Sequence, residues 1–141
     1  MSSALPIPAA LAELIRTDVW PTAESANSQN LHPVADPETI DRVASGETKL
    51  FLEPPPFQTL AAEIAANPDF WQEHGALNEI DKDLALVIGD FGLGSDTAIV
   101  LDYRASPTEP SVKFLQWTDE GTRWAEVAPN FKAFAQALQL V

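Results

Sequence analysis

The chain has 141 residues and carries 8 Lys and Arg against 21 Asp and Glu, a formal net charge of −13 at pH 7. A charge of this sign repels nucleic acids and anionic membrane surfaces, whose protein ligands present basic footprints. It favours a basic protein partner instead, because opposite charges accelerate the encounter of two proteins. No cysteine is present, which excludes disulfides and Cys-based zinc sites.

The length predicts a single domain over residues 1–141, because domains average about 150 residues. With 45% hydrophobic and 21% charged residues, the composition is that of a folded protein. No apolar run approaches the roughly 18 residues that a membrane-spanning helix needs. The opening MSSALP also lacks the basic and apolar regions of a secretory signal. We therefore expect a cytoplasmic protein.

The first eighty residues follow helical patterns. Apolar residues recur at helical spacing over 8–20, where Val19 is the last of the stripe, and Pro21 is expected to end that helix. Asp36-Pro37 is an N-cap followed by a first-turn proline, and it opens a second helix that Gly46 stops. Two more helices are expected in this half of the chain, and they cover 57–65 and 68–74.

After residue 84 the hydrophobic period changes to that of strands. The run 84–88 is continuously apolar and short, which predicts a strand buried on both faces. The other expected strands are residues 50–52, 97–103, 112–117 and 123–127, with a last helix opened by Pro129. Short turns between consecutive strands favour antiparallel pairing. The sequence therefore predicts an α+β fold, with a mainly antiparallel sheet of about four to six strands and helices before and after it.

Residues 89–96 (GDFGLGSD) form the densest group of turn-forming and acidic residues. Glycines in a turn between two strands permit positive φ, and this structural explanation accounts for most of the pattern. A hard-cation site built from Asp90, Asp96 and Asp102 is a second interpretation, since carboxylates suit such ions. The spacing does not match a calcium loop, and the loop has no lysine for a phosphate cradle.

Two tryptophans flank the turn expected at 118–122. Either core packing or surface exposure fits Trp117 and Trp124, and exposed tryptophans are anchor residues of protein interfaces. The acidic residues Asp119, Glu120 and Glu126 lie close to them in sequence and would form a charged rim. This pattern indicates a surface for a basic partner.

No catalytic arrangement stands out. His32 lies in a polar loop and His74 at a helix end, where surface or capping histidines are common. Neither a Gly-x-Ser-x-Gly elbow nor a His-Glu-x-x-His motif occurs. We therefore expect no enzyme activity, no catalytic residues, no cofactor and no resident metal.

The second half of the chain resembles the SUKH superfamily. The resemblance rests on the order of segments: an apolar strand, IGDFGLGSD at 88–96, IVLDYR at 99–104, a strand ending in Trp117, and Trp124 followed by VAPNF at 127–131. This group contains Knr/Smi-type regulators of cell-wall synthesis and many bacterial immunity proteins against polymorphic toxins. The match covers about residues 82–141.

The resemblance implies one SUKH-like (Knr/Smi-like) α+β domain with a protein-binding rather than a catalytic role. It implies an immunity protein that binds and neutralises a toxin domain, for instance a nuclease, and a basic nuclease suits the acidic charge. A scaffold like the cell-wall regulators is the alternative, and a small metal-dependent hydrolase is the third. The residues expected to bind the partner are Asp90, Asp96, Asp102, Trp117, Asp119, Glu120 and Trp124.

Overall fold

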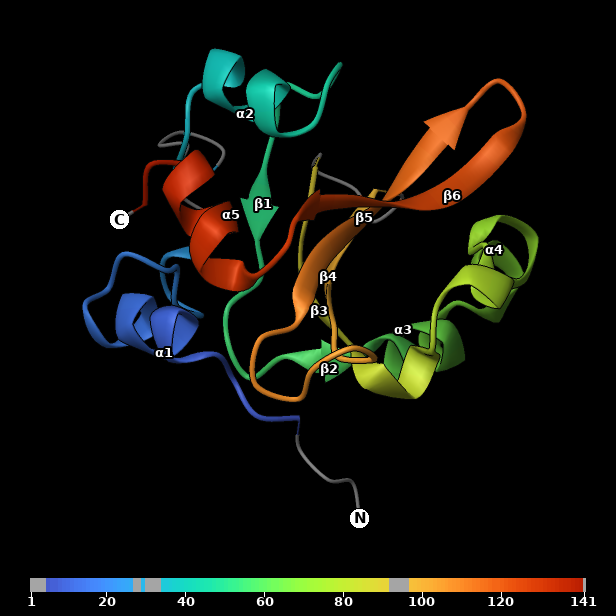
Figure 1. Ribbon diagram of the computed structural model, residues 1–141, viewed down its shortest axis with the longest axis horizontal. Coiled ribbons are helices and arrows are strands. Elements are labelled where there is room, and N and C mark those ends of the chain that lie inside the picture. The colour runs from blue at the N-terminus through green and yellow to red at the C-terminus, as the bar shows by residue number, and fades with distance from the viewer. Residues whose placement is uncertain (1–4, 27–28, 30–33, 92–96, 141) are drawn as a thin grey trace.

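The computed structural model describes residues 5–26, 29, 34–91 and 97–140 (Figure 1). The helices are α1 (Ala9–Arg16), α2 (Pro37–Val43), α3 (Leu60–Ala66), α4 (Pro68–His74) and α5 (Phe131–Ala137), and the 3₁₀ turns η2 (Leu77–Glu79) and η3 (Lys82–Leu84) precede β3. The strands are β1 (Phe51–Leu52), β2 (Gln58–Thr59), β3 (Ala85–Asp90), β4 (Ala98–Asp102), β5 (Ser111–Thr118) and β6 (Gly121–Ala128).

The strands form one antiparallel six-stranded sheet in the order β1-β3-β4-β5-β6, and β2 also pairs with β3. The sheet confirms the predicted α+β fold and its antiparallel pairing. The two shortest strands share one edge of β3, since Leu52 lies opposite Gly89 and Thr59 lies opposite Leu86. The sequence pattern wrongly placed Gln58 and Thr59 in the helix expected over 57–65, because they pair with β3 as β2 and α3 begins only at Leu60.

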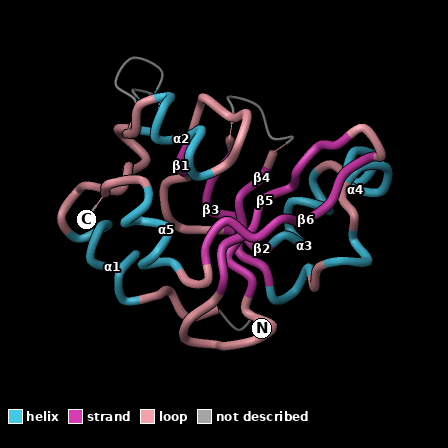
Figure 2. The backbone as a smooth tube through the Cα atoms, turned by 45° about the horizontal axis from the view of Figure 1, so that its top comes forward, coloured by secondary structure: helices cyan, strands magenta, loops and turns pink. Residues whose placement is uncertain are grey.

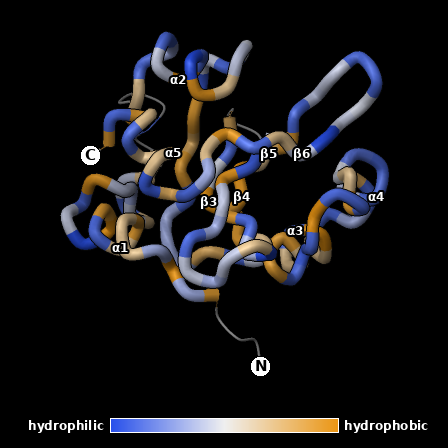
Figure 3. Tube along the Cα trace, in the orientation of Figure 1, coloured by the Kyte–Doolittle hydropathy of each residue, from blue (hydrophilic) through white to orange (hydrophobic). Residues whose placement is uncertain are grey.

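Helices cover both faces of this sheet (Figure 2). Alternate residues of β3 point to opposite sides, so that Ile88 packs with residues of α1, α2 and α5, whereas Val87 packs with Leu60 of α3 and Trp71 of α4. All residues of β3 and β4 are buried. The predicted burial of this apolar run on both faces is therefore confirmed. Hydrophilic residues are concentrated in the outer turns and in the β5–β6 hairpin (Figure 3).

Helix α1 is shorter than its apolar pattern predicts. It ends at Arg16, and Asp18 takes a left-handed conformation with φ of 63°. The chain then reverses, and the backbone N–H groups of Val19 and Trp20 both donate to the carbonyl of Leu14. This reversal leaves Val19 41% exposed, so its place on the buried stripe was wrong. It also buries Trp20 completely, with the indole Nε1 donating to the Glu53 carbonyl.

Gly89 has a packing role rather than the turn role expected for the glycines of the 89–96 segment. It lies inside β3, next to β1. A Cβ built on Gly89 would stand 2.6 Å from the backbone carbonyl oxygen of Phe51, which is closer than real Cβ atoms approach. The absence of a side chain therefore lets β1 lie against β3. The other glycines of the segment, at 92 and 94, lie outside the described residues.

We expect Gly89→Ala to lower the free energy of unfolding by about 1–3 kcal/mol, because the added methyl group must push β1 away from β3. Chemical denaturation monitored by tryptophan fluorescence measures the change. Ser45→Ala, at an exposed position, provides the control. A loss no larger than that of the control would show that β1 moves aside without cost.

Candidate functional site

Asp102 ends β4 as a buried carboxylate that is fully engaged by neighbours. Its side chain is 3% exposed, and the guanidinium of Arg104 donates to both of its oxygens, with Nη2 2.8 Å from Oδ2. The Lys113 ammonium on β5 lies 2.7 Å from the same oxygen. The backbone N–H of Arg104 also donates to Oδ1. These contacts tie the end of β4 to β5 and leave no face of the carboxylate for a partner.

The electrostatics of Asp102 follow from these contacts. Burial raises the pKa of a carboxyl, but the hydrogen bonds from Arg104 and Lys113 outweigh burial here and lower the pKa of Asp102 from 3.8 to about 2. The ionised form is therefore the one that stabilises the fold. Since the folded-state pKa is depressed, this stabilisation is present above about pH 4 and is lost as the pH falls toward 2.

We expect Asp102→Asn to destabilise the protein at pH 7 by about 2 kcal/mol, the free energy that corresponds to the lowered pKa. The deficit relative to the unmodified chain should shrink as the pH falls from about 4 to about 2, where the native carboxyl becomes protonated. Urea unfolding across this pH range measures it. Glu109→Gln, in an exposed loop, is the control. A pH-independent deficit would contradict the ionic origin of the stabilisation.

Asp90 is also buried and acts within the fold. Its Oδ1 accepts from the Thr97 hydroxyl at 2.8 Å, and its Oδ2 accepts from the Thr97 backbone N–H. These bonds join the end of β3 to the start of β4. Asp90 lies opposite Ala98, so four residues of β4, or roughly 13 Å, separate it from Asp102. These two carboxylates cannot share one metal ion, and Asp96 lies outside the described residues.

Tyr103 completes the structural roles of the LDYR segment. Its hydroxyl donates to the carbonyl of Pro6 at 2.7 Å, which fixes the segment before α1 against the sheet. Burial raises the pKa of this phenol to about 12. Tyr103 is neutral at physiological pH and serves as a hydrogen-bond donor, whereas its neighbours Asp102 and Arg104 contact each other.

The two hairpin tryptophans belong to a row of aromatic rings shared with α4, which lies beside the hairpin (Figures 1 and 2). Trp124 stacks on Trp71 with an interplanar angle of 2° and centroids 6.3 Å apart. Phe70 contacts Trp71 edge-on, and its centroid lies 6.3 Å from that of Trp117. His74 lies 4.9 Å from Trp117. The row therefore runs from the core to the surface.

Trp124 is the buried end of this row. It is 9% exposed, and its indole Nε1 donates to the Gly75 carbonyl at 2.8 Å. Its backbone N–H donates to the Glu79 carboxylate at 2.9 Å, so the edge strand β6 meets a side chain at this point rather than another strand. The structure thus places Trp124 inside the fold, where it holds the hairpin against α4 and η2.

Trp117 is the exposed end of the row. Its side chain is 44% exposed, and the exposed acids Asp119 and Glu120 lie in the turn that follows it. Among the described residues that the sequence singled out for partner binding, these three are the exposed ones. The pattern of the sequence did not assign Phe70 and His74 to this surface.

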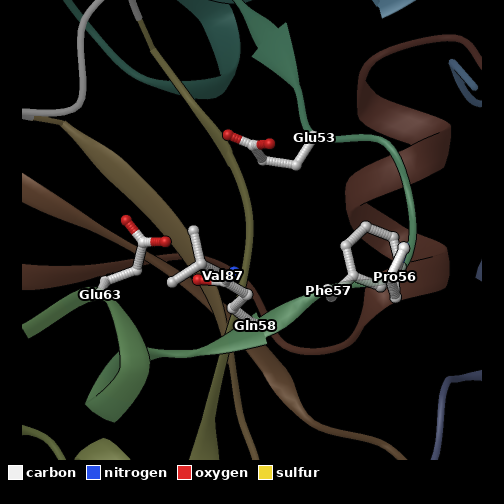
Figure 4. A pocket seen from close by; sticks show the side chains of 6 residues that line it. All are labelled: Glu53, Pro56, Phe57, Gln58, Glu63 and Val87. Carbon is white, nitrogen blue, oxygen red and sulfur yellow. The ribbon is translucent and has the colours of Figure 1, made fainter. Parts of the chain in front are cut away.

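A small pocket opens between the two short edge strands, where the chain passes from β1 to β2 (Figure 4). It holds about 130 Å³ and is lined by Glu53, Pro56, Phe57, Gln58, Glu63 and Val87. The carboxylates of Glu53 and Glu63 point into the same space beside Val87 (Figure 4). Burial raises the pKa of Glu53, and the negative charge of Glu63 raises it further. The pocket is therefore an electrostatically unfavourable spot in the fold.

We expect Glu53→Gln to stabilise the protein at pH 7 by a few tenths to about 1 kcal/mol, because it removes a partly buried charge and its repulsion by Glu63. The folded-state pKa of Glu53 is raised, so the gain should be absent in acid, grow as the pH rises from the unfolded-state pKa toward the folded-state pKa, and be complete above the latter. Thermal unfolding at several pH values measures it. Glu24→Gln, an exposed acid elsewhere, is the control. Equal effects of the two substitutions would point to net charge alone.

Comparison with protein-family models, with curated proteins and with solved structures finds no match for this chain. Among the described residues, no helix has the length and apolar character to cross a membrane. Within the same residues, no three His, Cys, Asp or Glu side chains are grouped so as to hold a metal ion. The structure thus defines an α+β protein whose aromatic row reaches the surface beside an acidic hairpin turn.

Proposed function

We propose that this chain is a non-catalytic protein-interaction module that binds a basic partner, and specifically an immunity protein that neutralises a toxin domain such as a nuclease. The observation that carries the proposal is the surface position of Trp117 next to Asp119 and Glu120. Large aromatic side chains at the surface are typical anchors of protein interfaces, and the flanking carboxylates match lysines and arginines of a partner.

The charge of the whole chain supports the same conclusion. A net charge of −13 attracts a basic protein over a distance and speeds its approach. A nuclease domain suits this field, since the groove that meets phosphate is basic. An acidic protein seated on such a groove would exclude the nucleic acid by occupying its site.

The resemblance to the SUKH superfamily supports the specific role of an immunity protein within this proposal. The order of strands and the Asp-Tyr-Arg segment support it, and so does the antiparallel sheet between helices. Asp90 and Asp102 enter this proposal as residues that hold the fold, because both are engaged internally. The binding surface is thereby assigned to Trp117, Asp119 and Glu120.

A co-expression experiment tests the immunity role. The genes that flank the gene for this chain are searched for a toxin-like domain, which is expressed in cells with and without the chain while growth is followed. Rescue of growth, together with a one-to-one complex on purification, is the expected result. Growth arrest despite an abundant, folded chain would overturn the immunity role, and capture of wall-synthesis proteins instead would move the assignment to the scaffold alternative.

We expect the association rate of the complex to fall about tenfold or more when the salt concentration rises from about 0.05 to about 0.5 M, because salt screens the long-range attraction. Surface plasmon resonance measures the rate. The dissociation rate should change much less, since short-range contacts determine it. An association rate that does not depend on salt would remove the electrostatic part of the proposal.

A further inference from the structure

The exposed end of the aromatic row is built from two elements far apart in the sequence. We use the name aromatic cradle for Trp117 of β5 together with Phe70 and His74 of α4. The Trp117 ring lies 6.3 Å from Phe70 and 4.9 Å from His74, at interplanar angles of 45° and 43°. The Thr122 hydroxyl on β6 donates to the His74 carbonyl, which joins the hairpin to the end of α4. The cradle is therefore a fixed surface.

The charges around the aromatic cradle are acidic. Asp69 and Glu73 lie on α4, and Asp119 and Glu120 lie in the turn after Trp117. The segments that carry these residues, 67–79 and 115–122, contain no lysine or arginine.

Lys113, four residues before Trp117, contacts Asp102. Arg123, which directly follows the second segment, alternates to the other face of the hairpin. There its Nε donates to the Gln116 side chain at 2.7 Å. Within the cradle, His74 Nε2 lies 3.6 Å from the Glu73 carboxylate, and the segments 67–79 and 115–122 offer no lysine or arginine to the other acids, so we expect a partner to supply that positive charge.

We infer that the aromatic cradle binds an arginine side chain of the basic partner, with the guanidinium over the Trp117 ring and its N–H groups directed to the neighbouring carboxylates. The inference rests on the proposed function, since it names the group that the partner inserts. A cation is attracted to the face of an aromatic ring, and tryptophan is the strongest acceptor of this kind.

Arginine fits this surface better than lysine or a second copy of the chain. The guanidinium is flat and weakly hydrated, and it stacks on a ring while its five donors remain available to carboxylates. An ammonium group is compact and strongly hydrated, so it gains less from stacking. A second copy would bring another charge of −13 to an already acidic surface.

The test uses three synthetic peptides with alternating glycine, in which every second residue is arginine, lysine or the uncharged citrulline. Each is titrated into the full chain at low salt, and the indole N–H resonances of the four tryptophans are followed by NMR. The resonance missing from Trp117→Phe identifies Trp117. We expect the arginine peptide to shift this resonance most and to bind more tightly than the lysine peptide, with the citrulline peptide weakest.

Two substitutions at Trp117 test how much the indole ring contributes to binding of the arginine peptide. Trp117→Leu should weaken binding of the arginine peptide about threefold or more, and Trp117→Phe should fall between that variant and the unmodified chain. The lysine peptide should lose less affinity. Thermal unfolding of both variants checks that the hairpin still folds. Equal affinities for the arginine peptide across the three proteins would overturn the inference.

The charge contribution is tested with matched double variants. Asp119→Asn with Glu120→Gln should weaken binding of both cationic peptides and reduce its dependence on salt, whereas Glu24→Gln with Glu109→Gln, elsewhere on the surface, should do so less. Equal losses in the two double variants would overturn the cradle but leave the proposed binding to a basic partner intact. The proposed function fails separately, through the absence of growth rescue by the unmodified chain.

Discussion

The burial of β3 and β4 on both faces is the constraint on which the rest of the structure depends. Because every residue of the two strands is buried, neither face of the sheet can remain in water, and helices must cover both. In these two strands, charged side chains occur only at the strand ends, where hydrogen-bond donors contact them. Asp90 meets the Thr97 hydroxyl there, and Asp102 meets Arg104 and Lys113. Asp90 and Asp102, two of the acids that look most like a functional motif, thus serve a sheet that is covered on both sides.

The β5–β6 hairpin is the part of the sheet to which this constraint does not apply along its whole length. Strands β5 and β6 have eight residues each, whereas β3 and β4 have six and five, so the hairpin extends beyond its neighbours in the sheet. A two-stranded ribbon is marginally stable alone. Helix α4 supplies the missing support through the stack of Trp71 on Trp124. The support covers the inner part of the hairpin, and Trp117 at the outer part remains accessible.

Sequence patterns were sufficient to predict features that depend on neighbouring residues. They failed where contacts between distant segments determine the structure. The change in the spacing of apolar residues, from helical to strand-like, located the main strands. Burial of a strand on one or two faces determines this spacing directly. The end of α1 was missed because the reversal at Asp18 depends on where Trp20 packs. Asp102 and Asp119 also look alike in the sequence. Their different environments follow from the pairing of β4 with β5, which brings Lys113 to a carboxylate that Arg104 already contacts, and no local pattern reveals that pairing.

In the candidate surface, two kinds of residue contribute to binding in different ways. The acids of the hairpin turn are exposed, so they act over a Debye length and influence how fast a basic partner arrives. Trp117 acts only on contact, and its neighbours Phe70 and His74 already hold the platform in place. An anchor that is ordered before binding loses little conformational freedom when the partner docks. The acidic turn should therefore govern association, and the aromatic row should govern how long the complex lasts.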